Sequence, residues 1–258
     1  MKRILNASFL AVLVCLGFAT TAKADPLTVR GSLDYVLGES VQFKLGSNGY
    51  DSTTAGLLMF IRPQDDLGTP AVNEAGTYPL DPSPDGNYFY SFCMDITEDV
   101  WYDDPFEWVV EEDLANGRNS AGYGAIGPVV AANLAKLFGA VFPDFSAPIN
   151  SVEAAALQIL VWEMIYETPG DAFDVSSGNM QFTADSSVIN QANSYLTAFA
   201  NYQGATANGL KALNAEGYQD QLIQVPTSPD TEEVPEPATF ALMGLGLAAV
   251  GFIRRRTA

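Results

Sequence analysis

Cys93 and Gln158 are the residues whose surroundings in the chain point most clearly to chemistry. Cys93 lies in Phe92-Cys93-Met94-Asp95, and a cysteine thiolate is a strong nucleophile. Gln158 lies in an apolar run, residues 154–161, where a buried carboxamide without a partner is unfavourable. We therefore expect Gln158 to have a polar partner. Trp162 follows Gln158 by four residues, so the two share one face of a predicted helix.

Each of these residues also has an ordinary structural interpretation. Cys93 is small and apolar enough to be a core residue, and Gln158 could bond to main-chain groups alone. Trp162 could belong to the core. The only other cysteine, Cys15, lies in a segment that we expect to be removed, so Cys93 would have no disulfide partner within the chain. A lone cysteine in an exported protein is a candidate reactive thiol.

Taken together, the two segments resemble the internal-thioester domains of bacterial surface adhesins. The first motif of that family is an aromatic residue or leucine, then cysteine, an apolar residue and aspartate, as in Phe92-Cys93-Met94-Asp95. The second is an apolar residue, glutamine, two variable residues, an apolar residue and tryptophan, as in Leu157-Gln158-Ile159-Leu160-Val161-Trp162. The resemblance is specific over residues 92–162 and general elsewhere.

The resemblance implies that the Cys93 sulfur displaces ammonia from the Gln158 carboxamide and forms a thioester. A lysine amine on a partner then attacks the acyl carbon and becomes linked by an amide bond. Asp95 would orient the site or transfer a proton, although a strand-end hydrogen bond is an equal alternative. Trp162, Phe89 and Tyr90 are candidates for a shield against water. The bond would be used once, so the protein would not be an enzyme, and it would need no cofactor.

Composition excludes several other classes of protein. The chain has 258 residues, with 12 basic and 31 acidic side chains and a net charge of −19, which disfavours nucleic acid as a partner. It contains no histidine, which removes Ser-His-Asp catalysis and histidine-ligated metals. We expect no metal site. The acidic pairs are interpreted as a solvated surface, and no pair of carboxylates points to a glycosidase.

The two ends of the chain are predicted to be targeting segments. Residues 1–24 have a basic start, a short apolar run and Ala22-Lys23-Ala24, as in a secretory signal. Residues 235–258 begin with Pro235-Glu236-Pro237, continue with a short apolar transmembrane helix over residues 238–253 and end in arginines. This tail resembles the PEP-CTERM sorting signal. It implies transient insertion in the inner membrane of a Gram-negative bacterium, processing by an exosortase-type enzyme and export to the cell surface or extracellular matrix, as in biofilms.

Between these ends, residues 25–225 are expected to form one thioester-type domain, followed by a linker over residues 226–234. Strands are predicted at residues 27–30, 40–45, 57–62, 88–96, 106–110 and 220–225, and helices at 129–138, 151–166 and 187–202. The fold class is α+β: an antiparallel sandwich or barrel-like sheet with a helical segment inserted before the last strand.

Two functions remain open from the sequence. The first is covalent attachment of a surface or matrix protein through a Cys93–Gln158 thioester, with a protein or matrix amine as partner. The alternative is a noncovalent structural or matrix-binding surface protein in which Cys93 and Gln158 are packed together without a bond.

Overall fold

The structure is a computed structural model that describes residues 28–61, 88–102, 105–119, 124–145 and 147–225. The expected signal (1–24), linker (226–234) and sorting tail (235–258) lie outside these residues, so the predicted domain boundaries stay predictions. Within the described ranges, no helix has the length and apolar character to cross a membrane. The apolar helix expected at residues 238–253 is not among them.

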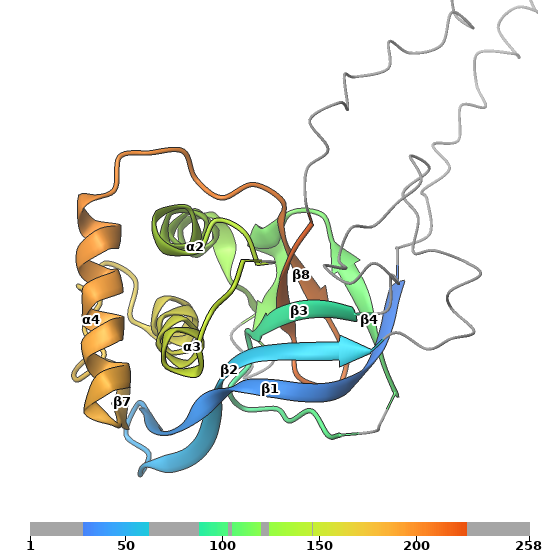
Figure 1. Ribbon diagram of the computed structural model, residues 1–258, viewed down its shortest axis with the longest axis horizontal. Helices are drawn as coiled ribbons and strands as arrows, with labels where there is room; N and C mark the ends of the chain where they lie inside the picture. Colours follow the sequence, from blue (N-terminus) through green and yellow to red (C-terminus); the bar gives the residue numbers. More distant parts are fainter. Residues whose placement is uncertain (1–27, 62–87, 103–104, 120–123, 146, 226–258) are drawn as a thin grey trace, which may run out of the picture.

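Seven strands form one antiparallel sheet, and six of these close into a ring. The order is β2-β3-β9-β8-β4-β1-β7, and β1 pairs with β2 as well, which joins the two sides of the sheet. Strand β7 extends from β1 outside the ring. The α+β class and the barrel-like form of the sheet are therefore confirmed (Figure 1). The strands are β1 (Thr28–Leu45), β2 (Asp51–Ile61), β3 (Tyr88–Cys93), β4 (Pro105–Glu111), β7 (Met180–Ala184), β8 (Leu210–Asn214) and β9 (Gln221–Gln224).

Strand β1 corrects the prediction of two separate short strands at residues 27–30 and 40–45. It is a single strand of 18 residues that pairs with β4 at its start, with β2 along most of its length and with β7 at its end. Gly38 lies opposite Gly56 in β2, and a Cβ atom on either would clash with the other strand's main chain. The paired glycines permit this close approach and let β1 continue between the two predicted strands.

Three helices lie together beside the barrel (Figure 1). They are α2 (Gly127–Val141), α3 (Ser151–Tyr166) and α4 (Ser186–Asn201). Helix α3 has the predicted bounds because Asn150 and Glu153 form a reciprocal capping box at its start. Helix α2 begins two residues before the predicted range of 129–138 and ends three residues after it. It continues through Gly139, whose missing side chain allows the 205–207 segment to approach.

Other boundaries differ modestly from the predicted ones. Strand β3 ends at Cys93 and not at residue 96, and β2 begins six residues before the predicted strand. Strands β7 and β8 were not predicted, so the inserted segment contains a strand and is followed by two strands. Two short elements complete the described fold: the 3-10 helix η2 (Leu114–Asn116) and a small ribbon formed by β5 (Arg118–Asn119) and β6 (Gly124–Ala125).

Aromatic clusters on both faces hold β3 in place. On one face, Phe89 stacks on Phe60 with ring centroids 5.1 Å apart, and Trp108 meets both rings edge-on. On the other face, Phe92 contacts Phe138, a residue of α2, at 5.5 Å. These contacts fix the strand between the barrel interior and the helices, and so fix the position of Cys93 at its end.

Candidate functional site

The candidate site forms where the end of β3 meets the middle of α3. The main-chain N–H of Cys93 donates a hydrogen bond to Oε1 of Gln158 at 2.8 Å. The Nε2 group of Gln158 donates to the main-chain carbonyl of Cys93 at 2.7 Å. The two residues are 65 positions apart in the chain, and both are buried. The polar partner that the sequence analysis expected for Gln158 is therefore Cys93.

Gln158 lies in a helix, α3, that is surrounded by apolar side chains. The residues from Ala154 to Tyr166 are all buried, so the helix runs through the protein and not along its surface. Within such a helix, a carboxamide needs two partners to satisfy its donor and its acceptor. Cys93 is the last residue of β3, so its main-chain groups are available to the helix.

Trp162 lies one helical turn after Gln158 and contacts the cysteine sulfur. Its indole N–H points to Sγ of Cys93 at 3.4 Å, and its ring stacks against Phe182 of β7 at 6.2 Å. The Cys93 thiol donates to the main-chain carbonyl of Asp95 at 2.9 Å. The structure thus brings Cys93, Gln158 and Trp162 into one buried cluster. The spacing predicted that Gln158 and Trp162 share a helix face, and the family resemblance implied their meeting with Cys93.

Asp95 is buried beside this cluster and shapes the turn after β3. Its Oδ1 atom accepts hydrogen bonds from the main-chain N–H and the hydroxyl of Thr97, both at 2.8 Å. It also accepts one from the Tyr166 hydroxyl at 3.2 Å. These contacts give Asp95 the strand-end role that was one of its two predicted roles. Transfer of a proton by Asp95 stays a prediction.

Tyr166 is a site residue that the sequence analysis missed. It lies one turn after Trp162, and its hydroxyl links Asp95 to the main-chain N–H of Ile96. Gln158, Trp162 and Tyr166 follow one another at intervals of four, which places them on a single stripe of α3. That spacing was readable from the sequence, and it marks the side of the helix that faces the end of β3.

The electrostatic setting keeps Cys93 in its thiol form at neutral pH. Burial raises the pKa of the thiol well above its ordinary value, and the nearby Asp95 carboxylate raises it further. The Trp162 N–H lowers the pKa of the thiol, but its effect is smaller than that of burial. An attack by this sulfur on the Gln158 amide must therefore depend more on the fixed positions of the two groups than on a thiolate that is already present.

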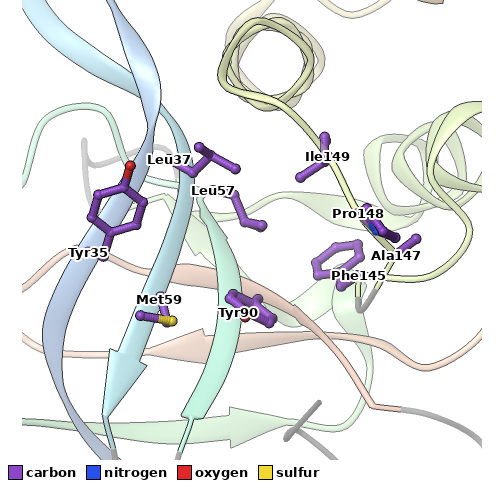
Figure 2. A pocket seen from close by; sticks show the side chains of 9 residues that line it. All are labelled: Tyr35, Leu37, Leu57, Met59, Tyr90, Phe145, Ala147, Pro148 and Ile149. Carbon is purple, nitrogen blue, oxygen red and sulfur yellow. The ribbon is translucent and has the colours of Figure 1, made fainter. Parts of the chain in front are cut away.

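The two other proposed shield residues lie elsewhere. Phe89 packs on Phe60 and Trp108, within the aromatic cluster of the barrel. Tyr90 lines a separate groove of about 280 Å³ between the first three strands and the segment before α3 (Figure 2). Because Met59 pairs with Tyr90 and Phe60 with Phe89, strand alternation puts this groove on the opposite face from Phe89. Trp162 is the candidate whose N–H points to the sulfur.

In the described part of the chain, no group of three or more cysteine and acidic side chains is arranged to hold a metal ion. Glu111, Glu112 and Asp113 follow one another at the end of β4, and Asp113 accepts a hydrogen bond from the main chain of η2. Asp103 and Asp104 lie outside the described residues. The structure therefore gives no support for a metal site at Glu111, Glu112 and Asp113.

Comparison with known proteins identifies the tail of the chain. Residues 233–256 match the PEP-CTERM protein-sorting motif. The PEP-CTERM motif implies export to the cell envelope or surface of a Gram-negative bacterium and processing by an exosortase-type enzyme. It begins two residues before the predicted boundary at residue 235 and supports the resemblance seen in the sequence. No curated protein and no solved structure matches the chain.

Proposed function

We propose that this exported protein contains a thioester between Cys93 and Gln158 and uses it to attach covalently to a primary amine on a cell-surface or matrix partner. The observation that carries the proposal is the double hydrogen bond between the Gln158 amide and the Cys93 main chain. This contact holds the acyl group against the residue that bears the nucleophile. The PEP-CTERM motif adds the export that a surface attachment requires.

The Cys93 N–H supports the first chemical step. When Sγ attacks the side-chain carbonyl carbon of Gln158, negative charge develops on Oε1. That oxygen already accepts a hydrogen bond from the Cys93 N–H at 2.8 Å, within the distance at which a donor stabilises an oxyanion. The C–S bond forms, the C–N bond breaks, and the thiol proton leaves with the amide nitrogen as ammonia.

The second step uses the stored bond. An amine nitrogen attacks the same acyl carbon, the C–S bond breaks, and a proton from the amine returns to the sulfur. The partner is then held by an amide bond to residue 158, and Cys93 is again a thiol. Since the amide is stable, each molecule reacts once, which makes the protein a chemical anchor and not a turnover enzyme.

Exclusion of water favours survival of the thioester. Gln158 is fully buried and only 2% of the Cys93 surface is exposed. Trp162 lies against the sulfur and is itself 1% exposed. Hydrolysis of an acyl group needs a water molecule at the carbonyl carbon, and the burial of these three side chains limits how much water can reach it.

A noncovalent structural role is the second candidate, and one observation favours it. Both polar groups of Gln158 are satisfied by Cys93 without any reaction, so the amide also serves as a clasp between α3 and β3. In that case the protein would be a surface or matrix component whose cysteine is a core residue. The two candidates differ in whether Gln158 can be labelled by an amine.

A fluorescent primary amine tests the proposal. Incubation with the folded exported protein should place the label on residue 158 and free one thiol per label. Cys93→Ala should take up none. Gln221→Ala is a matched control, because Gln221 is a second buried glutamine that bonds to β3, through Ser91 at 2.9 Å, and it should not affect labelling. Labelling that is absent from residue 158, or that persists in Cys93→Ala, would contradict the proposal.

A further inference from the structure

A pocket of about 190 Å³ reaches the candidate site from outside. Cys93 and Trp162 line it, and so do residues of β1, β2 and the segment that follows β3. Leu33 of β1 forms an isolated bridge with Tyr102, which brings that segment alongside β1. Gln158 lines neither this pocket nor the groove shown in Figure 2. The groove also lacks Cys93 and Trp162, whereas the pocket meets the sulfur side of the proposed bond.

The outer part of this pocket is polar and carries a negative charge. Thr53, Thr54, Asp99 and Gln219 contribute to its lining, and Asp99 and Thr54 are exposed. None of its lining residues is lysine or arginine. The inner part is apolar, with Leu33, Val36 and Leu58 beside Trp162. A pocket of about 190 Å³ with an apolar interior and an acidic rim suits an alkyl chain that ends in an ammonium group.

We infer that this pocket is the access route for the attacking nucleophile, and that Asp99 makes it selective for cationic amines on slender chains. The inference rests on the proposed thioester and adds the route and a selectivity residue. Asp99 would act as a positioning residue: its carboxylate attracts the ammonium form and raises the local concentration of amine. The amine must lose a proton before its nitrogen bonds to the acyl carbon, and the departing sulfur of Cys93 takes up a proton when the C–S bond breaks.

Two probes separate the effect of charge from the effect of access. Cadaverine resembles a lysine side chain and keeps a positive charge on the end that does not react. Hydroxylamine is small, largely neutral and reactive toward thioesters. The rate of mass gain with each probe is measured on the purified exported protein after its mass has shown that the thioester is present.

Asp99→Asn tests the charge. It should slow the reaction with cadaverine by about two- to fivefold, as expected for one exposed charge, and leave the rate with hydroxylamine unchanged. The cadaverine effect should fade at high salt. Asp171→Asn is the matched control, because Asp171 is an exposed acid that does not line the pocket, and both of its rates should equal those of the wild type.

Thr54→Trp tests the route. A large ring at this exposed lining position should slow both probes by about tenfold or more, because the inferred route enters through the pocket that Cys93 and Trp162 line. Ser52→Trp carries the same ring two residues earlier on the same face of β2, outside the lining, and should react like the wild type. Since both positions are exposed, neither variant disturbs the core.

The outcomes distinguish the two proposals. A protein of full mass would contradict the thioester and the inference together. A thioester that reacts at equal rates in Thr54→Trp and Ser52→Trp would overturn the route alone. A cadaverine rate that Asp99→Asn does not change would overturn the selectivity assigned to Asp99.

Discussion

Gln158 and Cys93 are joined by two hydrogen bonds of 2.8 and 2.7 Å between one side chain and one main chain, across 65 residues of sequence. The pairing attaches the centre of α3 to the end of β3. It also orients the Gln158 carbonyl so that its oxygen faces an N–H donor, which is the arrangement that acyl transfer requires.

Opening the thioester should lower the stability of the folded protein. A covalent bond between residues 93 and 158 closes a loop of 65 residues, and by analogy with a disulfide it should contribute about 4 kcal/mol to the free energy of unfolding. Treatment with methylamine should therefore lower the denaturant midpoint of the wild type. Cys93→Ala should have a low midpoint that methylamine does not change. Equal midpoints for the wild type before and after treatment would argue against the bond.

Replacing Trp162 by phenylalanine should reduce the protection and formation of the thioester. The variant keeps an aromatic ring but loses the N–H that points to the sulfur at 3.4 Å. Such an interaction contributes about 1 kcal/mol, so its loss should slow thioester formation by about fivefold. The fraction of ammonia-deficient protein after refolding gives the readout. Trp108→Phe is the control, because it removes a buried indole N–H that bonds elsewhere, to the carbonyl of Gln219. Equal fractions of ammonia-deficient protein in the two variants would show that the Trp162 N–H has no role in forming the thioester.

Tyr166→Phe should destabilise the turn after β3 without removing the reactive pair. The phenol donates to Asp95 and accepts from the Ile96 N–H, so its loss should lower the free energy of unfolding by about 1–2 kcal/mol. Burial and the nearby Asp95 raise the pKa of Tyr166, so it remains a donor throughout the accessible pH range. Chemical denaturation measures the loss. A variant as stable as the wild type would show that the turn does not need this bond.

Glu163 should make stability fall as pH rises. It is fully buried on α3, and burial raises its pKa to about 8 although the Asp174 N–H donates to one of its oxygens. Between about pH 4.5 and 8 the folded state holds a proton that the unfolded state has lost. Stability should therefore decrease through this window by up to about 1.4 kcal/mol per pH unit and level off above pH 8.

The Glu163→Gln variant isolates this contribution. Glutamine keeps the shape of the side chain and cannot ionise, so the variant should gain stability over the wild type as pH increases from 5 to 8. Glu216→Gln is the control at an exposed position, and its pH dependence should follow that of the wild type. Parallel curves for Glu163→Gln and the wild type would show that Glu163 is ionised in the folded protein at neutral pH.

The site was more predictable from the sequence than the sheet. Gln158 and Trp162 share a helix with strong end signals, and a carboxamide in an apolar helix requires a partner, so local rules were sufficient for them. Their meeting with Cys93 was predicted through a family resemblance, because no local rule places β3 next to α3. Tyr166 was missed although its spacing fits the same stripe.

The strands that were not predicted are extended because they pair with strands that are distant in sequence. Strand β8 has the sequence Leu-Lys-Ala-Leu-Asn, which has no strand-forming residues, and it is extended because β4 and β9 bond to its two sides. Strand β1 passes through Gly38, a residue that usually indicates a break, because Gly56 lies opposite it in β2. Each of these features depends on a partner distant in sequence.

The mass of the intact, folded exported protein tests the central claim most directly. The thioester predicts that the wild type is lighter than its sequence by one ammonia, that Cys93→Ala and Gln158→Ala show no such deficit, and that a small amine restores mass while releasing one thiol. A wild type of full mass, with a Cys93 thiol that titrates freely after denaturation, would contradict the account and leave a noncovalent clasp between α3 and β3.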